Sequence, residues 1–242
     1  MAMISVRHLH VGQRIADVSF ALEAGGVLGV IGPNGSGKST VLQSLAGILD
    51  HQGSIDFDGH SVETLTPRQR AQRIGLLPQS CESAWSLGVE DIVALGRLPW
   101  GDQDPDAIQC AIDQAGVREL LGRKVDRLSG GERARVWLAR VLAGQPRLLL
   151  ADEPIASLDL YYQRSVMEVL RQYAKAGQGV ILAIHDLGLA ARYCDQLCLM
   201  HHGKVHALGS PRTVLTEANL SAVFNVPVHV NLDSDPPIIA PG

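Results

Sequence analysis

The sequence predicts an α/β protein built on a mostly parallel sheet. Short runs of branched aliphatic residues recur along the chain, and helix-like stretches separate them. Runs that are apolar throughout are typical of parallel strands buried on both faces. The segment "GPNGSGKST" follows an early apolar run and opens a helix-like stretch, as in a phosphate-loop NTPase core. Aromatic residues make up only 4% of the chain, whereas hydrophobic residues make up 46%, so the predicted core is aliphatic.

The predicted elements follow one another in a regular order. A small antiparallel β layer is expected at the N-terminus. The apolar runs predict strands at 27–32, 73–78, 147–152 and 179–186. The stretches between them predict helices at 38–49, 131–144 and 159–176. Near the C-terminus, "LCLMHHGKVHAL" predicts a hairpin that turns near His202-Gly203.

One stretch of the chain departs from the alternation of strands and helices. Residues 80–128 show no strand pattern and carry helix-like segments near 89–97 and 105–121. We therefore predict a single domain, 1–242, divided into three parts. These parts are a catalytic α/β core at 1–79 and 146–225, an inserted helical subdomain at 80–145, and a C-terminal tail at 226–242. The tail is expected to form a short hairpin or to lie loosely on the surface.

Charge and composition limit the classes of partner and compartment. A net charge of −4 offers no electrostatic attraction for nucleic acid, so no nucleic-acid partner is expected. The four scattered cysteines are expected to be reduced thiols rather than zinc ligands. The start of the chain lacks a signal pattern, and no apolar run approaches the ~18 residues of a membrane span. We therefore expect a cytoplasmic protein that reaches the membrane only through a partner.

The glycine-rich segment matches the phosphate-loop pattern G-x-x-x-x-G-K-[ST] between a strand and a helix. Its backbone amides are expected to surround the phosphates, while Lys38 reaches the β- and γ-phosphates and Ser39 ligates Mg²⁺. The predicted ATP-binding residues are Gly32, Pro33, Asn34, Gly35, Ser36, Gly37, Lys38, Ser39 and Thr40.

Two acidic residues end the apolar run "LLLADEP". Because ligands bind at the carboxyl ends of parallel strands, Asp152 is expected beside the phosphate loop, where it holds Mg²⁺ through a water. Glu153 can project toward the γ-phosphate and accept a proton from the attacking water. The alternative is that Glu153 is a surface carboxylate that caps the following turn.

Four segments, "GPNGSGKST", "LSGGE", "LLLADEP" and "SLD", occur here in the order found in one family. Over essentially its whole length the chain resembles the nucleotide-binding subunits of ATP-binding cassette (ABC) transporters. The resemblance implies the ABC ATPase fold, ATP and Mg²⁺ as ligands, and ATP hydrolysis coupled to transport. A plain nucleotide kinase would need an acceptor-binding lid in place of "LSGGE".

The resemblance also accounts for a second glycine turn placed ahead of a helix. In this family two subunits pair head to tail, and each ATP lies between the phosphate loop of one and the "LSGGE" of the other. A homodimer is therefore implied, with the positive end of the helix dipole facing the partner's nucleotide. The segment Ser157-Leu158-Asp159 resembles the loop that crosses this interface. The residues implied to contact the partner's ATP are Ser129, Gly130, Gly131, Glu132 and Asp159.

Two further positions match the family by their place in the chain. Gln79 in "LLPQS" resembles the glutamine that contacts Mg²⁺ and the water, and it joins Ser39 and Asp152 in the predicted metal site. His185 resembles the histidine that touches the γ-phosphate. The predicted catalytic residues are thus Glu153, His185 and Gln79.

One departure concerns the base. The family usually stacks adenine on an aromatic side chain from the N-terminal strands, but Phe20, the only aromatic residue of this region, lies in the wrong place. His10 or Val11 is expected in the neighbourhood instead, so base recognition is predicted to be weak. His201 and His202 match no role, and Trp137 is expected to pack in the core.

The chain is expected to dock, as a peripheral protein, on two separate permease subunits at the cytoplasmic face of the inner membrane. The segment "DIVALGRLPW" (91–100) and the tail resemble the branch that imports metal chelates: ferric siderophores, haem and cobalamin. An extracytoplasmic substrate-binding protein would select the cargo. The alternative is a soluble ABC ATPase acting on ribosomes or DNA, which generally has two cassettes, a coiled coil or basic extensions.

Overall fold

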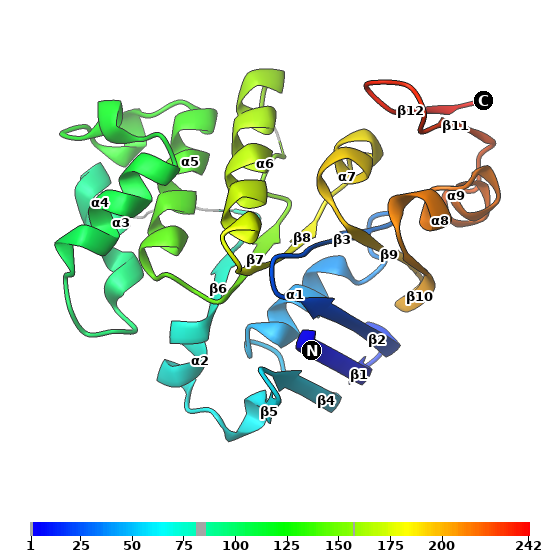
Figure 1. Ribbon diagram of the computed structural model, residues 1–242, viewed down its shortest axis with the longest axis horizontal. Helices are drawn as coiled ribbons and strands as arrows, with labels where there is room; N and C mark the ends of the chain where they lie inside the picture. The colour runs from blue at the N-terminus through cyan, green and yellow to red at the C-terminus, as the bar shows by residue number, and fades with distance from the viewer. Residues whose placement is uncertain (1, 81–85, 157) are drawn as a thin grey trace.

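The computed structural model describes residues 2–80, 86–156 and 158–242. Its strands fall into two main sheets and a small C-terminal hairpin (Figure 1). The strands of the two main sheets are β1 Ala2–Val11, β2 Ile15–Glu23, β3 Val27–Ile31, β4 Gln52–Phe57, β5 His60–Ser61, β6 Ile74–Leu77, β7 Leu148–Asp152, β8 Gly179–Ala183, β9 Gln196–His201 and β10 Lys204–Gly209.

The larger sheet has the strand order β10-β9-β3-β8-β7-β6. All of its pairs are parallel except β9 with β10, which form the predicted hairpin. Its strands are buried on both faces, because Leu148 and Leu150 enter one hydrophobic cluster while Leu149 and Ala151 enter the other. Burial on both faces explains why these strands are apolar throughout in the sequence. The prediction of a mostly parallel sheet is confirmed.

The smaller sheet, in the order β2-β1-β4-β5, is antiparallel throughout and confirms the predicted N-terminal layer. The helix α1, Lys38–Leu45, lies between this sheet and the larger one (Figure 1). It contributes Val41, Leu42 and Leu45 to the same cluster as the inward-facing residues of β1 and β2. The phosphate-loop helix is therefore fixed from two sides.

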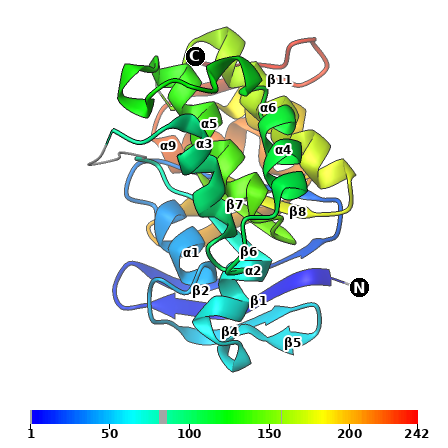
Figure 2. The same ribbon diagram turned by 90° about the vertical axis from the view of Figure 1, so that its left-hand side faces the viewer.

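Most of the remaining helices cover the other face and one end of the larger sheet, whereas α2 lies below β6, on the side of α1 (Figure 1). Their bounds are α2 Pro67–Arg73, α3 Val89–Ala94, α4 Pro105–Gln114, α5 Gly130–Ala143, α6 Leu160–Lys175, α7 Leu187–Tyr193, α8 Pro211–Val214 and α9 Glu217–Phe224. Figure 2 shows α3, α4 and α5 gathered into one group, as predicted for the inserted segment. Within the described part of 86–145, the β pairing is one isolated bridge, Gly88 with Lys124.

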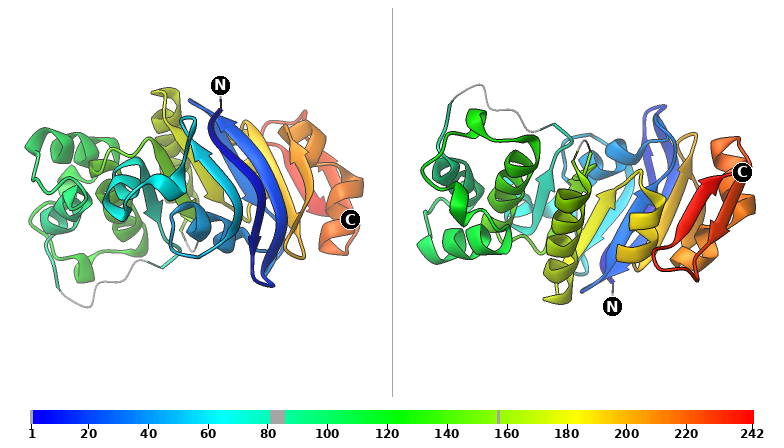
Figure 3. Two further views of the ribbon diagram at one scale, coloured as in Figure 1. Left: turned by 90° about the horizontal axis from the view of Figure 1, so that it is seen from below. Right: turned by 90° about the horizontal axis from the view of Figure 1, so that it is seen from above.

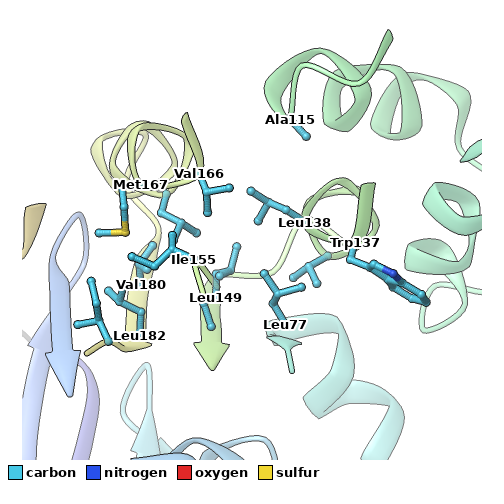
Figure 4. Packing of buried hydrophobic residues seen from close by; sticks show 14 of the residues in the cluster. Leu77, Ala115, Trp137, Leu138, Leu149, Ile155, Val166, Met167, Val180 and Leu182 are labelled. Carbon is cyan, nitrogen blue, oxygen red and sulfur yellow. The ribbon is translucent and has the colours of Figure 1, made fainter. Parts of the chain in front are cut away.

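The core under α5 and α6 joins this helical group to the sheet (Figure 4). Leu149 of β7 lies between Met167 of α6 and Leu77 of β6, and all three are buried. Trp137 is 7% exposed and belongs to the same cluster, which confirms its predicted packing role. One continuous core therefore packs the helical group against the strands β6 and β7.

Two predicted helices end earlier than expected, and glycine is the reason in both. The helix predicted at 38–49 ends at Leu45, because Gly47 takes a left-handed φ of +74°. The segment 105–121 breaks after Gln114, where Gly116 has a φ of +62° and a short 3₁₀ turn follows. The sequence analysis did not predict α2, although Thr66 and Gln69 form a capping box around Pro67.

The C-terminal tail forms a hairpin of β11, Val228–Asn231, and β12, Ile238–Pro241. Figure 3 shows it beside α7 and α9. Alternate side chains, Val228 and Val230, pack against the main core cluster, so the hairpin prediction rather than the loose tail is confirmed. Among the described residues, no helix combines the length and apolar character needed to cross a bilayer.

Candidate nucleotide site

The phosphate loop connects the end of β3 to α1, and two of its glycines are required by close packing. A Cβ on Gly32 would lie 2.3 Å from the carbonyl oxygen of Met200, and one on Gly37 would lie 2.4 Å from Ile15. Both glycines also have positive φ. Gly37 is the N-cap of α1, and no described side chain caps the helix. The first-turn amides of α1 can therefore bind an anion.

Lys38 lies folded over this loop and is only 5% exposed. Its Nζ donates hydrogen bonds to the carbonyl oxygens of Gly32 at 3.0 Å and Pro33 at 3.1 Å. Burial lowers the pKa of Lys38, while Glu153 and Asp152 oppose that shift. The bonded partners of this ammonium are neutral carbonyl oxygens, so a phosphate group at the loop would give it a charged hydrogen-bond partner.

Ser39 and Asp152 meet at the start of α1. The Ser39 hydroxyl donates a 3.0 Å hydrogen bond to Oδ1 of Asp152, which ends β7. Burial raises the pKa of Asp152, and the hydrogen bond from Ser39 opposes this shift. Ser39 and Gln79 both line the cavity, and Asp152 is bonded to Ser39, so the three side chains offer the hard oxygen ligands that suit Mg²⁺. The donor set thus fits the predicted metal.

Two predicted catalytic residues, Gln79 and His185, contact the carboxylate of the third, Glu153. Glu153 accepts a hydrogen bond from Nε2 of Gln79 at 2.8 Å, and its other oxygen lies 2.5 Å from Nε2 of His185. The side chain of Glu153 therefore contacts Gln79 and His185. Among the described residues of the following turn, no backbone amide bonds to this carboxylate, so the turn-capping alternative has no support there. The Ala156 amide bonds instead to the backbone oxygen of Glu153.

Glu153 also has a strained backbone, with a φ of +50°. Its amide donates to the carbonyl oxygen of Ala183 in the neighbouring strand at 3.1 Å, and its carbonyl oxygen accepts from Ala156. Left-handed backbone at a non-glycine residue is uncommon and persists where the surroundings impose it, often at functional sites. Here it directs the carboxylate of Glu153 away from the strand and toward Gln79 and His185.

A cavity of about 970 Å³ collects these groups, which is a size typical of ligand sites. Most of the predicted phosphate-loop residues, together with Gln79, Glu153 and His185, line it. Two turns complete the wall. Gln13 and Arg14 come from the turn between β1 and β2, and His202 and Gly203 come from the turn between β9 and β10. The sequence analysis assigned no role to His202.

The N-terminal strands bring other residues to the cavity than those expected. The residues of the first hairpin that line the cavity are Gln13 and Arg14 rather than His10 or Val11. Val11 is 9% exposed within the core, and Nδ1 of His10 bonds to the backbone oxygen of His8. Phe20 is buried in the cluster between the two sheets, which agrees with its predicted exclusion from the site.

The "LSGGE" segment lies outside the lining of this cavity. Ser129 is the N-cap of α5 and forms a capping box with Glu132, since the Ser129 amide donates to Glu132 Oε2 at 2.8 Å. Hydrogen bonds from Ser129 lower the pKa of Glu132. Ser129 and Gly130 are exposed, whereas Gly131 lies under the ring of Tyr162. A Cβ added to Gly131 would lie 2.4 Å from a ring carbon of Tyr162.

Asp159 stands at the start of α6, on the other side of the same tyrosine. It is the N-cap of α6, and its side chain accepts a 3.0 Å hydrogen bond from the Tyr162 amide. Tyr162 therefore joins two of the elements predicted to face a partner, the start of α5 and the start of α6. Ser157, which belongs to the same predicted loop, lies outside the described residues.

Known proteins of similar sequence and structure point to one class. The family model described as ABC transporter matches residues 15–156. "Hemin import ATP-binding protein HmuV" of Pseudomonas fluorescens (strain Pf0-1) is 43% identical over 241 residues, which covers 94% of each chain. The protein of that name from Bordetella pertussis is 40% identical over 230 residues, or 89% of this chain and 88% of its own.

Two solved structures extend the likeness to the fold. A metal-chelate type ABC transporter in an inward-facing conformation is 28% identical with a TM-score of 0.85, covering 99% of this chain and 96% of its own. The protein cbiO1 from Clostridium perfringens, part of the ABC transporter complex cbiONQ, is 27% identical with a TM-score of 0.81. That match covers 93% of this chain and 94% of cbiO1.

Proposed function

The chain belongs to the ABC transporter family, and we propose that it is the ATP-hydrolysing subunit of an importer of metal chelates, with haemin as the first cargo to test. The enzymatic part rests on one observation, which is the placement of Glu153 between Gln79 and His185 in the cavity of the phosphate loop. In this arrangement the Glu153 carboxylate would act as a base in the cavity that binds phosphate.

The phosphate loop and the predicted catalytic residues of the cavity then each have a role in hydrolysis. The amides of the phosphate loop and Lys38 hold the β- and γ-phosphates and stabilise the charge that develops on them. Glu153 accepts a proton from the water that attacks the γ-phosphate. His185 contacts the γ-phosphate and orients Glu153 through their 2.5 Å contact, while Gln79 holds the other carboxylate oxygen.

Mg²⁺ is the metal we propose for this site. When bound, it supplies charge neutralisation between the β- and γ-phosphates. Ser39 and Gln79 would ligate it directly and Asp152 would do so through a water, which the 3.0 Å hydrogen bond between Ser39 and Asp152 supports. Asp152 needs its negative charge for this role, and its burial strengthens its interaction with a nearby cation.

A homodimer completes the site in this proposal. The exposed Ser129 and Gly130 would face the γ-phosphate held by the partner subunit, as would the first turn of α5. Beside Asp159, Leu160 is 84% exposed and Tyr161 is 76% exposed. Large apolar side chains exposed in this way are typical of surfaces that another chain covers. Their position next to the predicted interface loop supports the head-to-tail pairing.

The helical subdomain, residues 80–145, is the proposed docking site for a permease subunit, so that the homodimer would bind two of them. Leu98 is 70% exposed, and Leu95 and Trp100 are each 37% exposed on the same short segment. This segment is held in a fixed shape, because Arg97 is 4% exposed and its guanidinium pairs with Asp102 at 2.8 Å. A rigid apolar surface of this kind suits a helix of a membrane-embedded partner.

The same segment is tied to the nucleotide-binding core. Arg68 of α2 donates hydrogen bonds to the carbonyl oxygens of Pro99 at 2.7 Å and Trp100 at 2.6 Å. A change of the core on nucleotide binding would therefore move the docking surface with it. The subunit would act peripherally at the cytoplasmic face of the membrane, and an extracytoplasmic binding protein would deliver the cargo to the permease.

The names of the relatives supply the argument for the cargo. The two curated relatives reported above are haemin import ATP-binding proteins, and one solved structure is a metal-chelate type transporter. These names support an importer and give no support to a soluble ATPase that acts on ribosomes or DNA. The pocket that selects a chelate would lie in the permease and the binding protein.

Reconstitution tests the proposal. The chain is co-expressed with a permease encoded beside it, purified as a complex, and placed in liposomes with the binding protein loaded with haemin, a ferric siderophore or cobalamin. We expect haemin to stimulate ATP hydrolysis most. Leu98→Ser should reduce recovery of the permease, whereas the control Leu208→Ser, on the edge strand β10, should not. Hydrolysis without any permease association would contradict the importer role.

A further inference from the structure

The cavity lining contains an aromatic ring that the reaction just described does not use. Among the described residues of the lining, the only ring side chains are those of His185 and His202. His185 is held by Glu153 and belongs to the γ-phosphate end. His202 comes from the turn between β9 and β10 and lines the cavity together with Gln13 and Arg14. The cavity lining therefore includes a second ring, which the catalytic carboxylate does not hold.

Main-chain hydrogen bonds attach the turn that carries His202 to the phosphate loop. The Gly203 amide donates to the carbonyl oxygen of Ser36 at 3.2 Å, and the Gly203 carbonyl oxygen accepts from Ala16 at 2.8 Å. A Cβ on Gly203 would lie 2.4 Å from the carbonyl oxygen of Arg14. The turn is thus held between the phosphate loop and the first hairpin, at a place the backbone determines.

The conformation of this turn and a neighbouring ring orient the His202 side chain. His202 and Gly203 have φ of +47° and +76°, as in two-residue hairpin turns that need left-handed backbone at both positions. The ring of His202 lies 3.9 Å from that of His201, with 38° between their planes. His201 thus supports one face of the ring, while the side chain of His202 stays exposed to the cavity.

We propose that the imidazole of His202 is the platform on which the nucleobase of ATP stacks. This inference rests on the proposed ATP site, because Lys38, Glu153 and His185 fix the γ-phosphate end and leave the nucleoside the end lined by Arg14 and His202. Every base has a π face, and histidine is among the rings on which bases stack. The ring replaces a platform that the N-terminal strands lack, since Phe20 is buried elsewhere.

The variants are chosen to remove the ring and keep the turn. His202→Asn deletes the imidazole while asparagine tolerates the left-handed backbone. His202→Tyr restores an aromatic face. His206→Asn is the matched control, because His206 is an exposed histidine of the same hairpin outside the cavity lining. Dissociation constants are measured by calorimetry on the purified chain with ATP and with inorganic triphosphate, which has no base.

We expect His202→Asn to weaken ATP binding roughly 5- to 150-fold, the range for loss of one base–aromatic stack. Inorganic triphosphate should bind as in the wild type, His202→Tyr should regain most of the ATP affinity, and His206→Asn should change neither ligand.

Each of the following results would overturn the inference. Unchanged ATP affinity in His202→Asn excludes the stack, and an equal loss for inorganic triphosphate places the effect in the loop at Ser36. Loss of ATP affinity in Arg14→Ala but not in His202→Asn assigns the base to the guanidinium. If the wild-type chain binds neither ligand, the proposed ATP site itself is wrong.

Discussion

Ser39 and Asp152 lie 113 residues apart in sequence, yet the Ser39 hydroxyl donates a 3.0 Å hydrogen bond to the Asp152 carboxylate. Asp152→Asn keeps an acceptor for that bond and removes only the charge. Since partners of metal ligands typically contribute 10–100-fold to metal affinity, we expect the Mg²⁺-dependent gain in ATP binding to fall by about that factor. Calorimetry with Mg²⁺ and with EDTA measures the gain. An unchanged ratio of the two affinities would remove Asp152 from the metal site.

Lys38→Ala should abolish tight nucleotide binding as well as turnover. Charge-assisted hydrogen bonds contribute about 1.5–3 kcal/mol each, so losing the ammonium should weaken ATP binding at least roughly tenfold. The ammonium also bonds to Gly32 and Pro33, so a thermal unfolding curve must show that the loop's fold survives. Lys38→Ala with near-normal affinity for labelled ATP would show that Lys38 does not hold the phosphates.

Most of the site was predictable because its residues belong to short local patterns. The phosphate loop lies between a strand and a helix that the sequence predicts. Asp152 ends another predicted strand, and Glu153 follows it directly. Their convergence with Gln79 and His185 follows from parallel strands ending at one edge of the sheet. The roles of Gln79 and His185 came from the resemblance to ABC transporters, because their spacing in the sequence does not indicate a role.

The residues that the sequence analysis missed depend on contacts between distant turns. His202 reaches the cavity because Gly203 bonds to Ser36, a contact that no local pattern encodes. In the same way, Arg14 rather than His10 faces the cavity because of where the first hairpin turns. Helix ends were missed for a simpler reason, since Gly47 and Gly116 adopt left-handed conformations inside stretches that otherwise favour helix.

ATP and GTP should have KM values within about tenfold of each other. Stacking on a ring tolerates any base, because it uses the π face rather than the hydrogen-bonding edge. The comparison needs only KM values for the two nucleotides under matched Mg²⁺. A preference for ATP above about a hundredfold would mean that a polar side chain reads adenine, and Gln13 in the same cavity wall would be the first to replace.

Ser129→Arg should leave ATP binding by the isolated chain almost intact and abolish hydrolysis. Ser129 lies outside its own chain's cavity, so the added bulk would block only the site of the partner subunit. Losing the cap of α5 should cost about 1 kcal/mol of stability. Thr66→Arg is the matched control, because Thr66 is another exposed capping-box residue, and it should hydrolyse ATP normally. Failure of Ser129→Arg to bind ATP would mean that "LSGGE" serves its own chain.

Glu153→Gln separates the chemistry of the site from its assembly. Glutamine keeps an oxygen that can accept from Gln79 and an amide that can face His185, so the arrangement around residue 153 should persist. It cannot take the water's proton, and loss of a general base typically slows a reaction about 10²–10⁴-fold. The contacts from Lys38, Ser39 and Asp152 remain, so ATP should bind and stay.

Removing a negative charge beside the γ-phosphate should also favour closure of the proposed dimer. We therefore expect Glu153→Gln to accumulate as an ATP-bound dimer in size-exclusion chromatography with Mg-ATP, while the wild type returns to monomer after each turnover. Hydrolysis at a near wild-type rate would assign the base elsewhere, with His185 the next candidate. A slow variant that stays monomeric at high protein concentration would keep Glu153 as the base. It would also require the permease, rather than ATP alone, to hold the two subunits in register.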